Sequence, residues 1–124
     1  MIENTEAGRC HKWGMFGRSP MPQWTQGRVT LLGDAAHPML PFLGQGVSMA
    51  IEDGIVLARA IAQHGATAAA LACYETARRP RANDIVERSA ARGEQVHRPS
   101  DSTDEMSIGL PPDIFSYDAV TVAL

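Results

Sequence analysis

The residues best suited to chemistry lie in one short stretch, from Gly33 to Asp53, with the sequence GDAAHPMLPFLGQGVSMAIED. Asp34 follows a predicted strand, so its carboxylate is placed to accept hydrogen bonds from a ligand hydroxyl. Gly33 allows a sharp bend there, or a close approach of the ligand to the backbone. A Gly-Asp pair after a strand is, taken singly, more often a simple turn. The functional interpretation therefore depends on the rest of the stretch.

A second feature of the stretch is the pair of glycines that flanks Gln45 where a helix is predicted to start. The first backbone N–H groups of a helix have no carbonyl partner within it, and the helix dipole makes that end positive. Gly44 and Gly46 have no Cβ, so a flat ring can lie directly against the backbone. This helix start suits a carbonyl oxygen or a developing anion, such as the pyrimidine edge of a reduced flavin.

Other titratable residues give weaker signals. His37 precedes Pro38 in a tight loop, so we interpret it as a structural hydrogen-bonding residue rather than a general base. Glu52 and Asp53 are adjacent on the predicted helix, where neighbouring side chains point about 100° apart. Asp53 is therefore expected to face a loop or cap rather than share a proton with Glu52. The other histidines lack metal-ligand spacing, so neither a catalytic residue nor a metal site is predicted.

A strand before this stretch and a helix after it are expected to position it. Arg28–Gly33 is the clearest strand, and its continuous apolar run favours a strand buried on both faces, as in a parallel sheet. Lys12–Phe16 is a second possible strand. A helix is predicted from about Gln45 to Gln63, with Gly65 as its C-terminal cap.

Further helices are expected after the glycine cap. Thr67 is placed to cap a second helix over Ala68–Arg78. Pro80 is predicted to break or kink that helix and to open a third one toward His97, because proline lacks the backbone N–H that a helix interior uses.

Length and composition restrict the class of protein. A chain of 124 residues is at most one domain of ordinary size, and its 44% hydrophobic and 20% charged residues are normal for a soluble globular protein. The 11 Lys and Arg against 14 Asp and Glu argue against a nucleic-acid partner. No apolar stretch approaches the roughly 20 residues of a membrane helix. Cys10 and Cys73 form no CxxC pair, so a reduced, cytoplasmic protein is the simpler assumption.

Charge is unevenly distributed toward the C-terminus. Residues 75–98 contain six arginines against four acidic residues, whereas residues 101–124 contain five acidic residues and no Lys or Arg. Two interpretations remain open. The favoured one is two independently solvated segments, and the other is an acidic tail that packs on an Arg-rich helix.

Taken together, residues 27–58 (GRVTLLGDAAHPMLPFLGQGVSMAIEDGIVLA) resemble the second FAD fingerprint of the flavoprotein aromatic hydroxylases, the salicylate and para-hydroxybenzoate hydroxylase family. That signature is an apolar strand, GDAAH, a Pro-containing loop, a QG or similar pair, and a helix containing an Asp. The resemblance covers roughly residues 12–98. It extends to Lys12-Trp13-Gly14, Arg18, Pro22-Gln23-Trp24, Tyr74-Glu75, Arg78, Arg81 and, in the tail, Ile114–Ala119.

The resemblance implies an α/β fold: the C-terminal fragment of an FAD-binding domain, Rossmann-like and of the glutathione-reductase type, mostly helical with one or two strands. This part would span residues 1–98, and residues 99–124 would be a loop-rich tail. Asp34 would bind a ribityl hydroxyl of FAD, and the amides of residues 44–48 would face the N1–C2=O2 edge of the flavin. The implied FAD-contacting residues are Gly33, Asp34, Pro41, Leu43, Gly44, Gln45, Gly46, Val47 and Ser48.

The activity implied is hydroxylation of a small aromatic substrate with NAD(P)H and O2. The N-terminal GxGxxG fingerprint, the DG-type motif and the substrate-binding sheet are missing from this sequence. We therefore expect a fragment that is inactive alone, retains no FAD alone, and exposes an apolar face that favours self-association. The alternatives are a non-catalytic docking module and a related flavin halogenase or reductase. The substrate and the choice between NADH and NADPH stay open.

Overall fold

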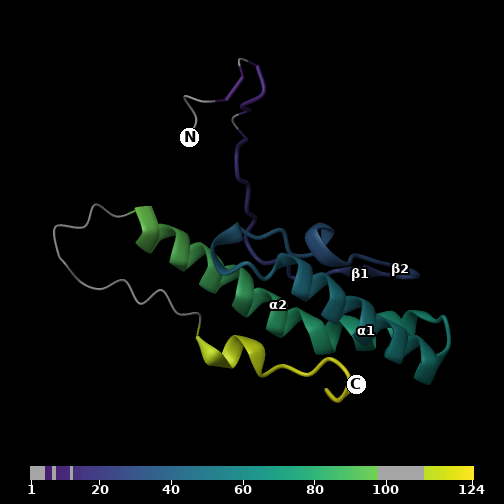
Figure 1. Cartoon of the computed structure of the whole chain (residues 1–124). Helices are drawn as coiled ribbons and strands as arrows, with labels where there is room; N and C mark the ends of the chain where they lie inside the picture. Colours follow the sequence, from purple (N-terminus) through teal and green to yellow (C-terminus); the bar gives the residue numbers. More distant parts are fainter. Residues whose placement is uncertain (1–4, 7, 12, 98–110) are drawn as a thin grey trace.

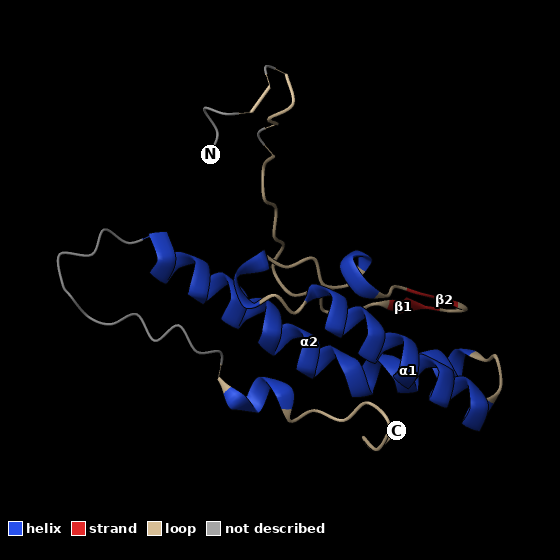
Figure 2. Ribbon diagram, in the orientation of Figure 1, coloured by secondary structure: helices blue, strands red, loops and turns tan. Residues whose placement is uncertain are grey.

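Two long helices dominate the computed structural model, which describes residues 5–6, 8–11, 13–97 and 111–124. Helix α1 spans Gly46–His64 and helix α2 spans Ala68–His97. The helices pack side by side (Figure 1), and the short strands β1 and β2 lie beside them. The described part is thus mostly helical with two strands (Figure 2), as the sequence predicts.

Helix α1 confirms the helix predicted from about Gln45 to Gln63. Small and apolar residues recur along it at helical spacing, which gives it one buried face. Gly65 ends it with a φ of 69°, a left-handed conformation that favours glycine. The residues buried on that face are Met49, Asp53, Val56 and Ala60.

Helix α2 is a single helix of 30 residues, so the break predicted at Pro80 and the third helix are wrong. Proline removes one hydrogen bond from the helix interior. Here the buried face continues on both sides of Pro80, and this packing holds the two halves in one helix. Thr67 caps the helix as predicted, since its Oγ1 accepts the Ala70 N–H at 3.3 Å. The buried face includes Tyr74, Arg78, Ala82, Ile85 and Ser89.

The strands form a small antiparallel hairpin. Strand β1 is Thr25–Gln26 and strand β2 is Val29–Thr30, paired Thr25 with Thr30 and Gln26 with Val29. The prediction of a parallel strand over Arg28–Gly33 is therefore wrong for the described part of the chain. An apolar run alone does not distinguish a central strand from a hairpin edge, and Val29 is 67% exposed here. The possible strand at Lys12–Phe16 is also wrong over residues 13–16, which form no strand.

The C-terminal segment, residues 111–124, packs on the helix pair, and Figure 1 shows it in yellow along the helices. Its Ile114 and Ala119 are buried in the core. Arg88 forms an ion pair of 2.7 Å with Asp113, and Arg81 donates a hydrogen bond to the carbonyl of Ile114. The favoured interpretation of independently solvated segments is thus wrong for residues 111–124, and the packed alternative is correct there. Asp101, Asp104 and Glu105 lie outside the described residues.

Candidate functional site

A groove of about 610 Å³ lies between the Gly33–Asp34 turn and the start of α1. It brings together the two places that the sequence predicts to share a ligand. Six of the nine predicted contact residues line it, namely Gly33, Asp34, Pro41, Gly44, Gly46 and Val47. The other lining residues are Leu32, Met39 and Ala50.

The other three predicted contact residues do not line the groove. Leu43 and Gln45 are buried beneath it, and the Gln45 side chain donates a hydrogen bond to the Leu43 carbonyl at 3.3 Å. Ser48 is exposed on the first turn of α1.

The turn that carries Asp34 is a short 3-10 helix, Gly33–Ala35, in which the carbonyl of Gly33 accepts the N–H groups of Ala36 and His37, both at 2.9 Å. Gly33 has a φ of 58°, which a side chain would strain. A Cβ at this position would also lie 3.4 Å from the Cβ of Ala50 on α1. The backbone conformation thus favours glycine, while an added Cβ would only come into van der Waals contact with the helix. Asp34 itself is exposed.

The opposite wall of the groove is the N-terminus of α1. Gly44 has a φ of 64° and turns the chain into the helix, and the first intrahelical partner is the Gln45 carbonyl, which accepts the Met49 N–H at 2.9 Å. The amides of residues 46–48 precede that bond, so helix geometry gives them no carbonyl partner. A Cβ added at Gly44 or Gly46 would meet no atom within 4 Å. The bare backbone here faces open space.

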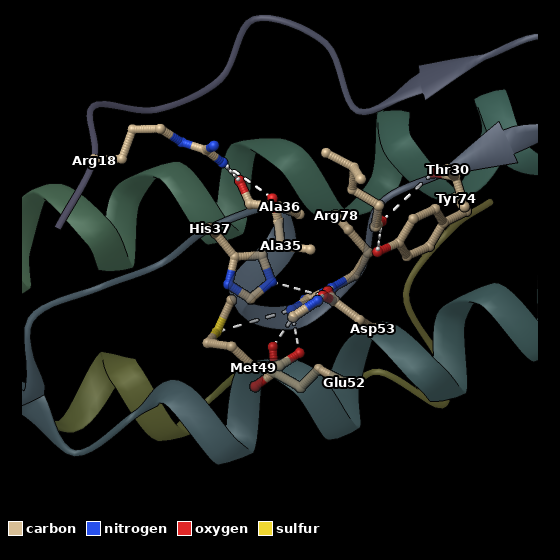
Figure 3. A network of polar contacts seen from close by, with 12 residues as sticks. Arg18, Thr30, Ala35, Ala36, His37, Met49, Glu52, Asp53, Tyr74 and Arg78 are labelled. Carbon is tan, nitrogen blue, oxygen red and sulfur yellow. Dashed lines mark hydrogen bonds and ion pairs between the residues drawn. The ribbon is translucent and has the colours of Figure 1, made fainter. Parts of the chain in front are cut away.

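A buried polar network lies directly behind the turn (Figure 3). The carboxylate of Asp53 on α1 accepts the Gly33 N–H at 3.0 Å and the His37 Nε2–H at 2.6 Å through the same oxygen, Oδ2. Its other oxygen, Oδ1, accepts the Nε–H of Arg78 from α2 at 2.8 Å. Asp53 and Arg78 are fully buried, and His37 is only 3% exposed.

Electrostatics keep this buried carboxylate ionised. Burial by itself raises the pKa of Asp53, but the hydrogen bonds from His37, Arg78 and the Gly33 amide outweigh it and hold the pKa below its ordinary value. Arg78 also forms an ion pair of 2.8 Å with Glu52, the residue that precedes Asp53 on α1. One guanidinium therefore bridges both carboxylates of the Glu52-Asp53 pair, and the two do not share a proton.

Two more contacts hold the turn and the strand before it. The Arg18 guanidinium donates hydrogen bonds to the carbonyls of Ala35 and Ala36 at 3.0 and 3.2 Å. The hydroxyl of Tyr74 on α2 donates to the Leu31 carbonyl at 3.2 Å. Burial of the Tyr74 ring raises its pKa, so this hydroxyl keeps its proton and remains a donor.

Sequence reasoning recognised part of this network. It assigned His37 a structural hydrogen bond and Asp53 a contact with a loop, and both are found. It did not connect Arg78 to Asp53, although both lie in segments singled out for their resemblance. The available signal was an acidic residue on a helix whose other buried positions are apolar, together with an Arg at helical spacing from Tyr74 on the next helix.

Comparisons with known proteins identify the family of this chain. Residues 4–89 match the FAD binding domain family, so the chain belongs to that family. It is 49% identical over 86 residues to an aurachin C monooxygenase/isomerase from Stigmatella aurantiaca, covering 69% of this chain and 22% of the relative. It is 49% identical over 76 residues to a 6-hydroxynicotinate 3-monooxygenase from Pseudomonas fluorescens, covering 60% and 20%.

A third relative is a 3-amino-4-hydroxybenzoate 2-monooxygenase from Streptomyces platensis, 45% identical over 94 residues, with 75% of this chain and 24% of the relative covered. These names confirm the resemblance to FAD-dependent aromatic-ring monooxygenases, with FAD as the cofactor of the family. The chain spans about a fifth to a quarter of the length of these relatives.

The described residues contain neither a membrane-spanning helix nor a cluster of metal-binding side chains. Neither helix there has a stretch long and apolar enough to cross a membrane. No group of three or more His, Cys, Asp or Glu side chains in the same part of the chain is arranged to hold a metal ion.

Proposed function

We propose that residues 33–48 form one wall of the FAD site in the Rossmann-like domain of an aromatic-ring monooxygenase that uses NAD(P)H and O2. The observation that carries the proposal is the shared groove, which is lined by Asp34 and by residues at the N-terminus of α1. The family match supports the choice of FAD. The names of the relatives favour a monooxygenase over the halogenase and reductase alternatives.

The groove residues fit a flavin with its ribityl chain. Asp34 offers carboxylate oxygens to hydroxyl groups of the chain, and a charged acceptor forms the stronger kind of hydrogen bond. The free amides of residues 46–48 and the positive end of the α1 dipole suit a carbonyl oxygen that gains negative charge. Gly44 and Gly46 leave room for a ring against the backbone. FAD, when bound, supplies the redox chemistry of oxygen insertion.

The apolar residues of the groove have a separate task. Met39, Pro41 and Val47 line it between the carboxylate and the helix start. Apolar walls there exclude water from a bound ring and strengthen the hydrogen bonds at its edges. A small aromatic compound is the proposed substrate of the complete enzyme, because relatives such as the 3-amino-4-hydroxybenzoate 2-monooxygenase carry such compounds in their names. A cytoplasmic location stays a prediction from cysteine usage.

A flavin-binding titration tests the proposal. FAD would be titrated into this chain alone, and into this chain mixed with the separately produced remainder of the 6-hydroxynicotinate 3-monooxygenase relative. We expect no retained FAD with the chain alone at micromolar concentration, and a flavin absorbance band after gel filtration of the mixture. Mixtures that co-elute without flavin would contradict the proposed site and favour the docking-module alternative.

A further inference from the structure

We propose that Asp53, held by Arg78, is the positioning residue of the groove: it fixes the Gly33–His37 turn and so directs Asp34. The inference rests on the proposed function, because it assigns the support of that same groove. Neither Asp53 nor Arg78 lines the groove. Both are fully buried, so they act on a ligand only through the turn.

The geometry of Asp53 places it at both ends of the turn. Its Oδ2 atom accepts the N–H of Gly33, the first residue, and the Nε2–H of His37, the last. Asp34 lies between these two points and has no side-chain hydrogen bond of its own recorded in the described part of the chain. A shift of either end therefore redirects the Asp34 carboxylate, whereas a fixed Oδ2 keeps it at the groove.

Arg78 fixes the carboxylate from the second helix. Its Nε–H donates to Oδ1 at 2.8 Å, and its guanidinium also pairs with Glu52 and approaches the Met49 carbonyl at 3.4 Å. The Tyr117 ring of the C-terminal segment lies 4.8 Å from the guanidinium carbon. Buried ion pairs add little net stability compared with apolar residues of similar size. The contribution of this pair is to fix the orientation of the Asp53 carboxylate, and so the position of its Oδ2 atom.

The molecule contains a matched arrangement away from the groove. Glu75 on α2 accepts the N–H groups of Trp24 and Thr25 at 3.0 and 2.8 Å and pairs with Arg79 at 2.8 Å. This too is a carboxylate that holds two donors of a distant segment and is paired with one arginine. It holds the hairpin strand β1 instead of the turn. The Glu75–Arg79 pair is therefore a control for the effect of removing such a pair in general.

The test removes each pair in the full chain without flavin. The double variant Asp53→Leu/Arg78→Met replaces the buried pair by apolar residues of similar size, and Glu75→Leu/Arg79→Met does the same at the hairpin. Amide hydrogen exchange, measured by NMR, would follow Gly33 relative to Ile85 in α2. We expect the first variant to speed Gly33 exchange at least about ten-fold relative to Ile85, because the amide loses a charged acceptor. The second should leave that ratio unchanged.

An unchanged Gly33 ratio in Asp53→Leu/Arg78→Met, or equal ratios in both double variants, would overturn the proposal. Should the first double variant fail to fold, the pair His37→Gln and His37→Leu carries the test. Glutamine keeps a donor for Oδ2, whereas leucine has none. We expect the amide resonances of residues 33–37 to shift and broaden in His37→Leu and to stay close to those of the unsubstituted chain in His37→Gln. Identical spectra for the two variants would contradict the role of Oδ2.

A flavin titration separates this inference from the function on which it rests. In the mixture with the remainder of the relative, Asp53→Leu/Arg78→Met should bind FAD at least about ten-fold more weakly than Glu75→Leu/Arg79→Met. FAD binding that is equal in both variants would overturn the positioning role and leave the function standing. No FAD binding by the mixture that contains the unsubstituted chain would contradict the function, and the Gly33 exchange ratio would still decide whether Asp53 sets the turn.

Discussion

The ring of Phe42 packs against helix α2 at Gly93. A Cβ added at position 93 would lie 2.6 Å from Cδ2 of that ring. Phe42 belongs to the 3-10 helix Pro41–Leu43, which contributes Pro41 to the groove. The absence of a side chain at Gly93 thus leaves the space in which the loop beside the groove packs on α2.

Gly93→Ala should therefore fail to stabilise the protein. Alanine gains about 1 kcal/mol of helix propensity over glycine, but overpacking costs about 1–3 kcal/mol. We expect an unfolding free energy that is unchanged or lower by up to about 2 kcal/mol. Gly54→Ala on α1 is the control, because its Cβ meets no atom within 4 Å; it should stabilise by up to about 1 kcal/mol. Urea unfolding measures both, and equal gains would show that Phe42 moves aside freely.

Asp34→Ala should weaken FAD binding in the reconstituted mixture by about ten- to one-hundred-fold, the loss expected for a hydrogen bond to a charged group. Asp34 is exposed, so the melting temperature of the chain should change little. Isothermal titration calorimetry with FAD gives the affinity. Equal affinities of the variant and the unsubstituted chain would remove Asp34 from the site.

Glu75 should make stability depend on pH in acid. Burial raises its pKa, but the hydrogen bonds from the Trp24 and Thr25 amides outweigh burial and lower the pKa below 4.5. A lowered folded pKa gives stability that is present above pH 4.5 and lost as the pH falls through the folded value. At pH 7, Glu75→Gln should cost about 1–3 kcal/mol. The difference from the unsubstituted chain should shrink below pH 4.5; urea titrations at several pH values test this, and a constant difference contradicts it.

Tyr117 should stabilise the protein through its ring. Its ring centroid lies 4.8 Å from the Arg78 guanidinium carbon and 5.1 Å from that of Arg81. Tyr117→Ala removes both cation–π contacts and is expected to cost about 1–3 kcal/mol. Tyr117→Phe keeps the ring over both cations and should change the unfolding free energy by less than about 0.5 kcal/mol. A large loss in the phenylalanine variant would instead assign the effect to the hydroxyl.

Self-association is predicted through exposed apolar side chains of α1. Ile51 is 59% exposed and Ile61 is 38% exposed, and neither lines the groove. Apolar surface of this kind favours contacts between copies. The variants Ile51→Glu and Ile61→Glu should therefore lower the average mass in sedimentation experiments. Val96→Glu, at an exposed position of α2, is the control and should leave the mass unchanged.

The sequence predicted the local features of the site well. Gly33, Gly44 and Gly65 lie at positions with a positive φ, where glycine chemistry alone indicates a turn or cap. The helix of α1 follows from its spacing of apolar residues. Six predicted contact residues share one groove because the stretch between Gly33 and Val47 folds back on itself. This folding is local, and the glycines and prolines of the stretch indicate it.

Features that depend on distant partners were not predictable in the same way. Whether Pro80 ends a helix depends on the packing of Tyr74 and Ile85 on either side, and helix propensity does not contain that information. Whether the strand at Val29 lies in a parallel or an antiparallel sheet depends on its neighbouring strand, which the apolar run itself does not specify. The Arg78–Asp53 contact joins residues of two helices that are 25 positions apart in sequence. A periodic pattern shows which face of a helix is buried, but it does not show which other helix packs on that face.

The groove has one consequence for how such a site can change. All of its lining residues fall between Leu32 and Ala50, while the two supports, Asp53 and Arg78, lie further along the chain. The other side chains that line the groove can therefore be exchanged together, provided that Gly33 and His37, which contact Asp53 from within the same segment, are kept. A library confined to those lining positions would vary the surface of the groove while the contacts of Asp53 with Gly33, His37 and Arg78 stay the same.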